Sequence, residues 1–226
     1  MTVQFAADQS YPTWVEHVFS HAVRPHGNAW YFDLDAPYVS GPPITVIGHM
    51  TRLFADPEPA LDFFADDQIA QGLYYVISPG ASDYMHHLYD VQVPAAARMQ
   101  CFTSMYTLFE RIFAPRCAQL LSHIDEPGTV PMNGVCYMWW DILATRVGRQ
   151  DHGQSEINAA ILSTLARTLE LPSVACQEAA LHGLGHTARY AQAQVNGLID
   201  EYLRRDATLR PELARYAQAA RSGCVL

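Results

Sequence analysis

Apolar residues recur along most of the chain three or four positions apart. The longest such pattern follows Pro94 and runs to Ala114, after which Pro115 ends it. Spacings of i, i+3, i+4 and i+7 place apolar side chains on one face of a helix with 3.6 residues per turn. Alternation of apolar and polar residues, which is typical of a half-buried strand, is hardly sustained anywhere. The pattern therefore predicts an all-α fold of about eleven helices with no sheet of consequence.

Proline, glycine and aspartate mark the ends of the predicted helices. Pro43 can occupy the first turn of a helix that Asp56-Pro57 ends, and Ser78-Pro79-Gly80 ends another helix. We expect further helices, in chain order, at residues 13–21, 43–55, 66–77, 95–114, 116–123 and 135–143, with a short one after Pro57.

The clearest helical patterns lie after Ser155, where four apolar patterns of similar length follow one another. They give two helices in roughly 40 residues, which is the repeat length of HEAT and armadillo proteins. The segments ACQEAALHGLGHTARY and VNGLIDEYL resemble the paired helices of a HEAT repeat. The resemblance covers about the last 70 residues and implies an irregular HEAT-like array or α-α superhelix, which presents an extended binding surface. A globular helical bundle is the alternative architecture.

The chain length suits one domain with a substantial core. The chain has 226 residues, of which 50% are hydrophobic and 16% are charged. We therefore expect a single all-α domain over residues 1–226. Within it, we expect an irregular segment at 1–40, a helical bundle at 41–150 and the HEAT-like pairs at 155–222.

The net charge limits the classes of partner, and the cysteines indicate the cellular compartment. The formal net charge is −9 and the sequence contains no lysine, which argues against nucleic acid and against Schiff-base catalysis. A basic protein is the partner that the charge favours. The five cysteines form no C-x-x-C pair, and no apolar run is long enough to span a membrane. These features predict reduced thiols, a cytoplasmic location and no membrane association.

One compact group of residues could carry chemistry. Glu178, His182 and His186 follow one another at intervals of four in SVACQEAALHGLGHTAR, so they share a helix face and could hold zinc or another divalent transition metal. Asp141 or His152 could supply a fourth ligand from another part of the chain. Asp141 stands within the apolar stretch VCYMWWDIL, where a buried carboxylate needs a partner.

Two glycines interrupt the helix that carries these histidines. Each of Gly183 and Gly185 costs about 1 kcal/mol relative to alanine inside a helix, so we expect a neighbouring helix to approach closely there. Gly183 also occupies the position where H-E-x-x-H peptidases carry their general base, which argues against a peptidase. A cysteine nucleophile, Cys136 or Cys176, would need a histidine brought to it by the fold.

Two functions remain open. The first is a non-enzymatic helical module that binds another protein, for example an acidic inhibitor or an immunity-like protein, and that needs no cofactor. The alternative is a metal-binding protein or metal-dependent enzyme that uses Glu178, His182 and His186. No catalytic residue and no organic cofactor site is assigned from the sequence.

Overall fold

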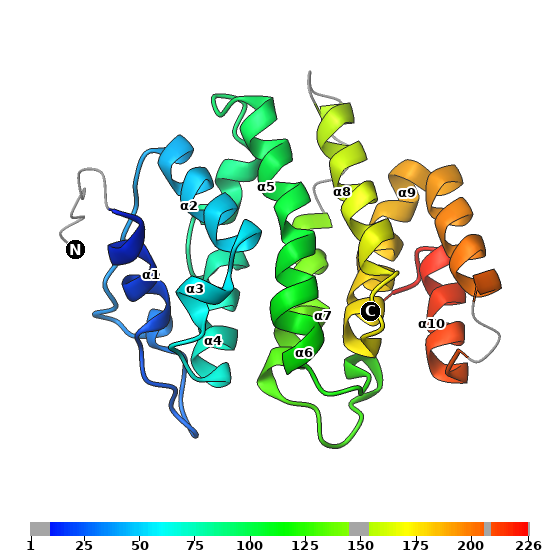
Figure 1. The fold of residues 1–226 in the computed structure, drawn as a ribbon, viewed down its shortest axis with the longest axis horizontal. Helices are drawn as coiled ribbons and strands as arrows, with labels where there is room; N and C mark the ends of the chain where they lie inside the picture. The colour runs from blue at the N-terminus through cyan, green and yellow to red at the C-terminus, as the bar shows by residue number, and fades with distance from the viewer. Residues whose placement is uncertain (1–9, 145–153, 206–208, 226) are drawn as a thin grey trace. The chain divides into compact units, whose positions relative to one another are not determined.

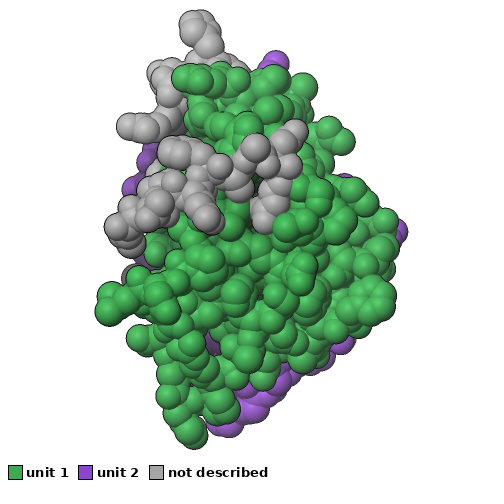
Figure 2. Space-filling model, turned by 90° about the vertical axis from the view of Figure 1, so that its left-hand side faces the viewer, with its two compact units in different colours: residues 1–108 green, residues 109–226 purple. Residues whose placement is uncertain are grey.

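The computed structural model describes residues 10–144, 154–205 and 209–225. Its contacts divide the chain into two compact units, residues 1–108 and residues 109–226, which Figure 2 colours separately. The division falls inside the bundle that the sequence predicts at 41–150. The single domain that the chain length favours stays a prediction.

The regular elements in the described part of unit 1 are helices joined by loops. Its longer helices pack in pairs, with α2 against α5 and α1 against α4. Gly72 on α4 allows one of these contacts, because a Cβ atom there would overlap the ring of Phe19. The elements are α1 (Tyr11–Phe19), η1 (Trp30–Phe32), α2 (Pro43–Ala55), α3 (Glu58–Leu61), α4 (Asp66–Ile77), η2 (Tyr84–Tyr89) and α5 (Ala95–Leu108).

Unit 2 is built around one long helix, α9, which packs against α7, α8 and α10 (Figure 1). The unit begins with a π-helical segment, η3, that is covalently continuous with α5. Its elements are η3 (Phe109–Phe113), α6 (Ala114–Arg116), η4 (Ser122–Ile124), α7 (Pro131–Ala144), α8 (Gln154–Thr168), α9 (Val174–Arg205) and α10 (Pro211–Arg221). The predicted all-α class is confirmed, and the described residues contain no β-sheet.

Two local predictions differ from the structure. The helix predicted at 116–123 is wrong, because the side-chain amide of Asn133 binds the N–H and the carbonyl of Ala118 at 3.0 and 2.9 Å and takes the place of helical hydrogen bonds. The two helices predicted from the segments ACQEAALHGLGHTARY and VNGLIDEYL form the single helix α9. Ala191, with φ −138° and ψ 42°, breaks its regular geometry between them.

The close approach of a neighbouring helix that was predicted at the interrupting glycines is confirmed at Gly183. A Cβ atom on Gly183 would lie 2.7 Å from Leu165 Cδ2 and 2.7 Å from Trp140 Cβ, so the glycine lets α9 approach α8 and α7. Gly185 has a different neighbour. The chain returns from α10 to α9, and the side chain of Val225 fills the space that a Cβ atom would need.

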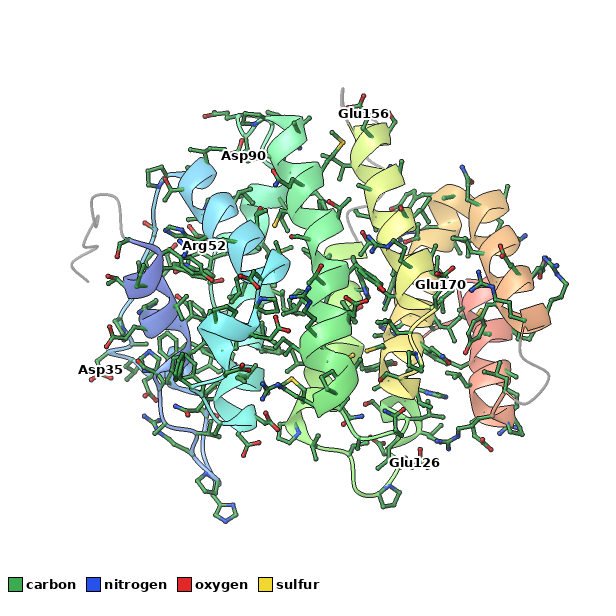
Figure 3. The ribbon with its side chains drawn as sticks, in the orientation of Figure 1. Asp35, Arg52, Asp90, Glu126, Glu156 and Glu170 are labelled. Atoms are coloured by element: carbon green, nitrogen blue, oxygen red, sulfur yellow. The ribbon has the colours of Figure 1, made fainter. Side chains whose placement is uncertain are left out.

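Ion pairs at the surface of unit 2 connect α9 and α10 to other segments. Arg205 binds Glu170 at 2.9 Å, and Arg210 binds Glu126 at 3.1 Å; Figure 3 labels both glutamates. The Arg205–Glu170 pair is exposed, and such a pair contributes little to stability. None of the helices in the described ranges is both long enough and apolar enough to cross a membrane.

Candidate metal centre

Three potential metal ligands meet between α7 and α9 in unit 2. His182 and His186 lie one turn apart on α9, and their Nε2 atoms are 3.0 Å apart. Asp141 comes from α7, with Oδ1 2.9 Å from His186 Nε2 and 4.0 Å from His182 Nε2. Two ligands bonded to one ion at 2.0–2.1 Å are separated by roughly 3–4 Å, so these spacings suit a shared ion.

A hydrogen-bonded chain fixes the orientation of His182. Its Nδ1 lies 2.6 Å from the hydroxyl of Tyr216 on α10, and that hydroxyl donates to the hydroxyl of Tyr137 on α7 at 3.2 Å. Because the Tyr216 hydrogen is directed to Tyr137, Tyr216 accepts from Nδ1–H of His182. The lone pair of His182 is then on Nε2, which faces the other two ligands. Metal-binding histidines are commonly oriented in this way by an acceptor for the second ring nitrogen.

Burial keeps both imidazoles neutral. Burial, together with smaller effects of the neighbouring His186 and His123, lowers the pKa of His182 to about 3. Burial also lowers the pKa of His186, against the opposing effect of Asp141, and Arg189 adds to the decrease. A neutral imidazole is the form that binds a metal ion. The site therefore offers two imidazole lone pairs and one carboxylate at neutral pH.

The ligand atoms of this cluster cannot all be satisfied by hydrogen bonds to one another, which favours a bound cation. His186 Nε2 faces both the lone pair of His182 Nε2 and the carboxylate of Asp141, at 3.0 and 2.9 Å. A neutral imidazole has one N–H, so it cannot donate fully to both acceptors. A divalent ion would accept all three lone pairs and remove this conflict. The three residues form a group whose ligand atoms lie within 4.8 Å of one another.

The structure does not bring Glu178 into this cluster. The Glu178 carboxylate is fully buried and accepts from the amides of Ser122 and His123 at 3.0 and 2.9 Å. It also contacts Nδ1 of His123 at 2.6 Å. Four residues turn a helix by about 400°, so each step of four drifts by about 40° and Glu178 lies about 80° around α9 from His186. Because of this rotation the Glu178 side chain faces the η4 segment. Asp141, in place of Glu178, supplies the third ligand atom of the cluster.

The other candidates named from the sequence are His152, Cys136 and Cys176. His152 lies outside the described residues. Cys136 and Cys176 are buried, and their thiols contact the backbone carbonyls of Ala175 and Phe109. Burial raises the pKa of Cys136 well above its ordinary value, which favours the unreactive thiol over the thiolate.

Sequence reasoning did not assign Tyr137, Tyr216 or His123 to the site. The His123 ring stacks on Tyr216 with centroids 4.0 Å apart, and Tyr137 packs on His182 with centroids 4.3 Å apart. One signal was available, because Tyr137 and Asp141 are four residues apart and therefore share a face of α7. No comparable signal connects Tyr216 or His123 to α9.

Comparison of the chain with protein-family models, with curated proteins and with solved structures finds no match. The resemblance of the last 70 residues to HEAT repeats therefore stays a prediction.

Proposed function

We propose that unit 2 binds one divalent transition metal ion through Asp141, His182 and His186. The observation that supports this proposal is the convergence of three ligand atoms within 4.8 Å from two helices. Two imidazole nitrogens and one carboxylate oxygen form a donor set found at catalytic zinc sites and at mononuclear iron sites. Zinc or another divalent transition metal therefore suits the cluster.

Three protein ligands leave at least one coordination position for water or a substrate. His182 is buried, whereas the side chains of His186 and Asp141 are 23% and 34% exposed, so small molecules can reach the cluster from solvent. A bound ion would polarise an oxygen atom and lower the pKa of a bound water molecule to about 7. These features favour a metal-dependent enzyme over a closed structural site.

Elemental analysis tests metal binding directly. The chain is purified without a histidine tag, and its metal content is compared with that of the double variant His182→Ala, His186→Ala. We expect about one metal ion per wild-type chain and a negligible amount in the variant. A wild-type chain without metal after incubation with Zn²⁺ would contradict the proposal, as would a folded variant that keeps its metal.

The protein-binding module remains a second proposal, supported by the net charge of −9 and the absence of lysine. A basic protein is the partner that this charge favours. Capture of partners at low and at high salt tests it. A specific partner retained at low salt and released at high salt would support this function, and no specific partner at either salt concentration would contradict it.

A further inference from the structure

Beside the metal ligands, unit 2 has a cavity of about 330 Å³ that is open to solvent. Its volume is at the lower end of the range for small-molecule sites. His186 belongs both to the cavity wall and to the proposed ligands, so a molecule in the cavity can contact one residue of the metal centre. The lining residues are Gly185, His186, Arg189 and Gln192 from α9, with Ser222 and Gly223 from the segment after α10.

Most hydrogen-bond donors around this cavity are already used. The amide nitrogen of the Gln192 side chain donates to Asn196 Oδ1 and to the carbonyl of Arg221, each at 2.8 Å. The Ser222 hydroxyl donates to the carbonyl of Ala219 at 2.9 Å. The backbone N–H of Gly223 donates to the carbonyl of Ala220 at 3.0 Å. These groups therefore hold the wall together and offer little to a ligand.

Arg189 differs from these residues because none of the described residues forms an ion pair with it. Its guanidinium lies over the ring of Tyr190, 4.6 Å from the centroid. Stacking on a ring leaves the N–H groups at the guanidinium edge available. Arg189 and His186 both line the cavity.

His186 offers a second donor. Its Nε2 faces Asp141 and His182, while its Nδ1 has no hydrogen bond to any described residue. A histidine that binds a metal through Nε2 carries its hydrogen on Nδ1 and commonly donates it to an acceptor. Nδ1 and Nε2 lie on different edges of the ring, so a ligand oxygen that accepts this hydrogen is a different atom from the oxygen that binds the metal ion.

We propose that this cavity takes a small molecule with a carboxylate or phosphate group, which supplies an oxygen to the metal ion and pairs with Arg189. This inference rests on the metal site proposed above. A divalent ion, the Asp141 carboxylate and the Arg189 guanidinium together carry a net charge of +2, because 2 − 1 + 1 = 2, which favours an anion. Guanidinium groups also match the oxygens of carboxylate and phosphate in geometry.

Cobalt-loaded protein tests the inference, since anions that enter the coordination sphere of Co²⁺ change its visible absorption. Wild-type protein, Arg189→Gln and Arg215→Gln are loaded with Co²⁺ and titrated with inorganic phosphate and with acetate. Arg215 is an exposed arginine on α10 that does not line the cavity, so Arg215→Gln is the matched control for loss of one charge. The two anions show which oxyanion group the site prefers.

We expect saturable binding of at least one anion to the wild type and to Arg215→Gln. Arg189→Gln should bind Co²⁺ normally and the anion about tenfold more weakly. Co²⁺ binding without an anion response, or an equal response in Arg189→Gln, would overturn the inference and leave the metal site intact. Failure of Co²⁺ and Zn²⁺ to bind the wild type would instead overturn the metal site on which the inference rests.

Discussion

Asp141 Oδ1 lies 2.9 Å from Nε2 of His186, and this contact joins α7 to α9. The two residues are distant in sequence and reach each other because α7 and α9 pack against each other. Gly183 allows this approach, since its missing side chain leaves space for Trp140 of α7. The packing of the core therefore determines the geometry of the proposed metal site.

The hydrogen bond between His182 and Tyr216 should support metal affinity. Tyr216→Phe removes the acceptor for Nδ1–H of His182 and keeps the ring that packs on His123. We expect Zn²⁺ affinity to fall about 10- to 100-fold. Tyr190→Phe, which removes a hydroxyl from an exposed ring on α9, should leave affinity unchanged. Equal affinities for the two variants in a chelator competition assay would show that the Tyr216 hydroxyl has no such role.

Two glycines of α9 should respond in opposite directions to substitution by alanine. Gly183→Ala places a methyl group 2.7 Å from Leu165 and Trp140, so we expect a loss of about 1–3 kcal/mol in the free energy of unfolding. A Cβ atom on Gly197 would have no neighbouring atom within 4 Å, so Gly197→Ala should gain up to about 1 kcal/mol from helix propensity. Urea denaturation measures both, and stabilisation by Gly183→Ala would contradict the close packing of α7 and α8 on α9.

The buried carboxylate of Glu178 should be important for stability. Glu178→Gln replaces an oxygen that accepts N–H groups of the η4 segment with an amide that donates, which we expect to cost about 2–3 kcal/mol. Glu170→Gln changes an exposed carboxylate of the same unit and should have little effect. Thermal unfolding of both variants checks this prediction, which fails if their midpoints are the same.

Unit 1 should lose stability in mildly acidic solution. Burial and the neighbouring His21 lower the pKa of His17 to about 4, against 6.5 for an ordinary histidine. Between these values the unfolded chain binds a proton that the folded chain does not. The free energy of unfolding should therefore decrease as the pH falls from about 6.5 to about 4, and this contribution should not change further below that range.

His17→Gln isolates this contribution. Allowing for the part of the ring that water reaches, we expect about 1–2 kcal/mol of the decrease to be absent from the variant. Denaturant titrations at several pH values compare the two proteins. The same pH dependence in both would contradict the assignment to His17.

The helical class and part of the site were predictable from local spacing. His182 and His186 are one turn apart, and the spacing of four predicted their common face correctly. The same rule did not extend to Glu178, because the drift of a helix accumulates over eight residues. The role of Gly183 was also predictable, since an unfavourable residue inside a helix needs a packing reason.

The rest depends on which helices become neighbours. Asp141 was visible as a charged residue in an apolar stretch, but its partner depends on the packing of α7 against α9. Tyr216 reaches His182 only because α10 packs on α9. Spacing along one helix contains no information about such contacts. The sequence therefore predicted that the two histidines share a face and did not determine the other residues of the site.

The most direct test of the metal centre compares Zn²⁺ affinity in Asp141→Asn and Glu178→Gln by chelator competition, at a temperature where circular dichroism shows both variants folded. Asp141 is a ligand in this account, and Glu178 supports the η4 segment. We predict that Asp141→Asn weakens Zn²⁺ binding at least about 100-fold, beyond the usual effect of an outer-shell change, while Glu178→Gln stays close to the wild type. Wild-type affinity in Asp141→Asn, or loss of binding only in Glu178→Gln, would contradict the account.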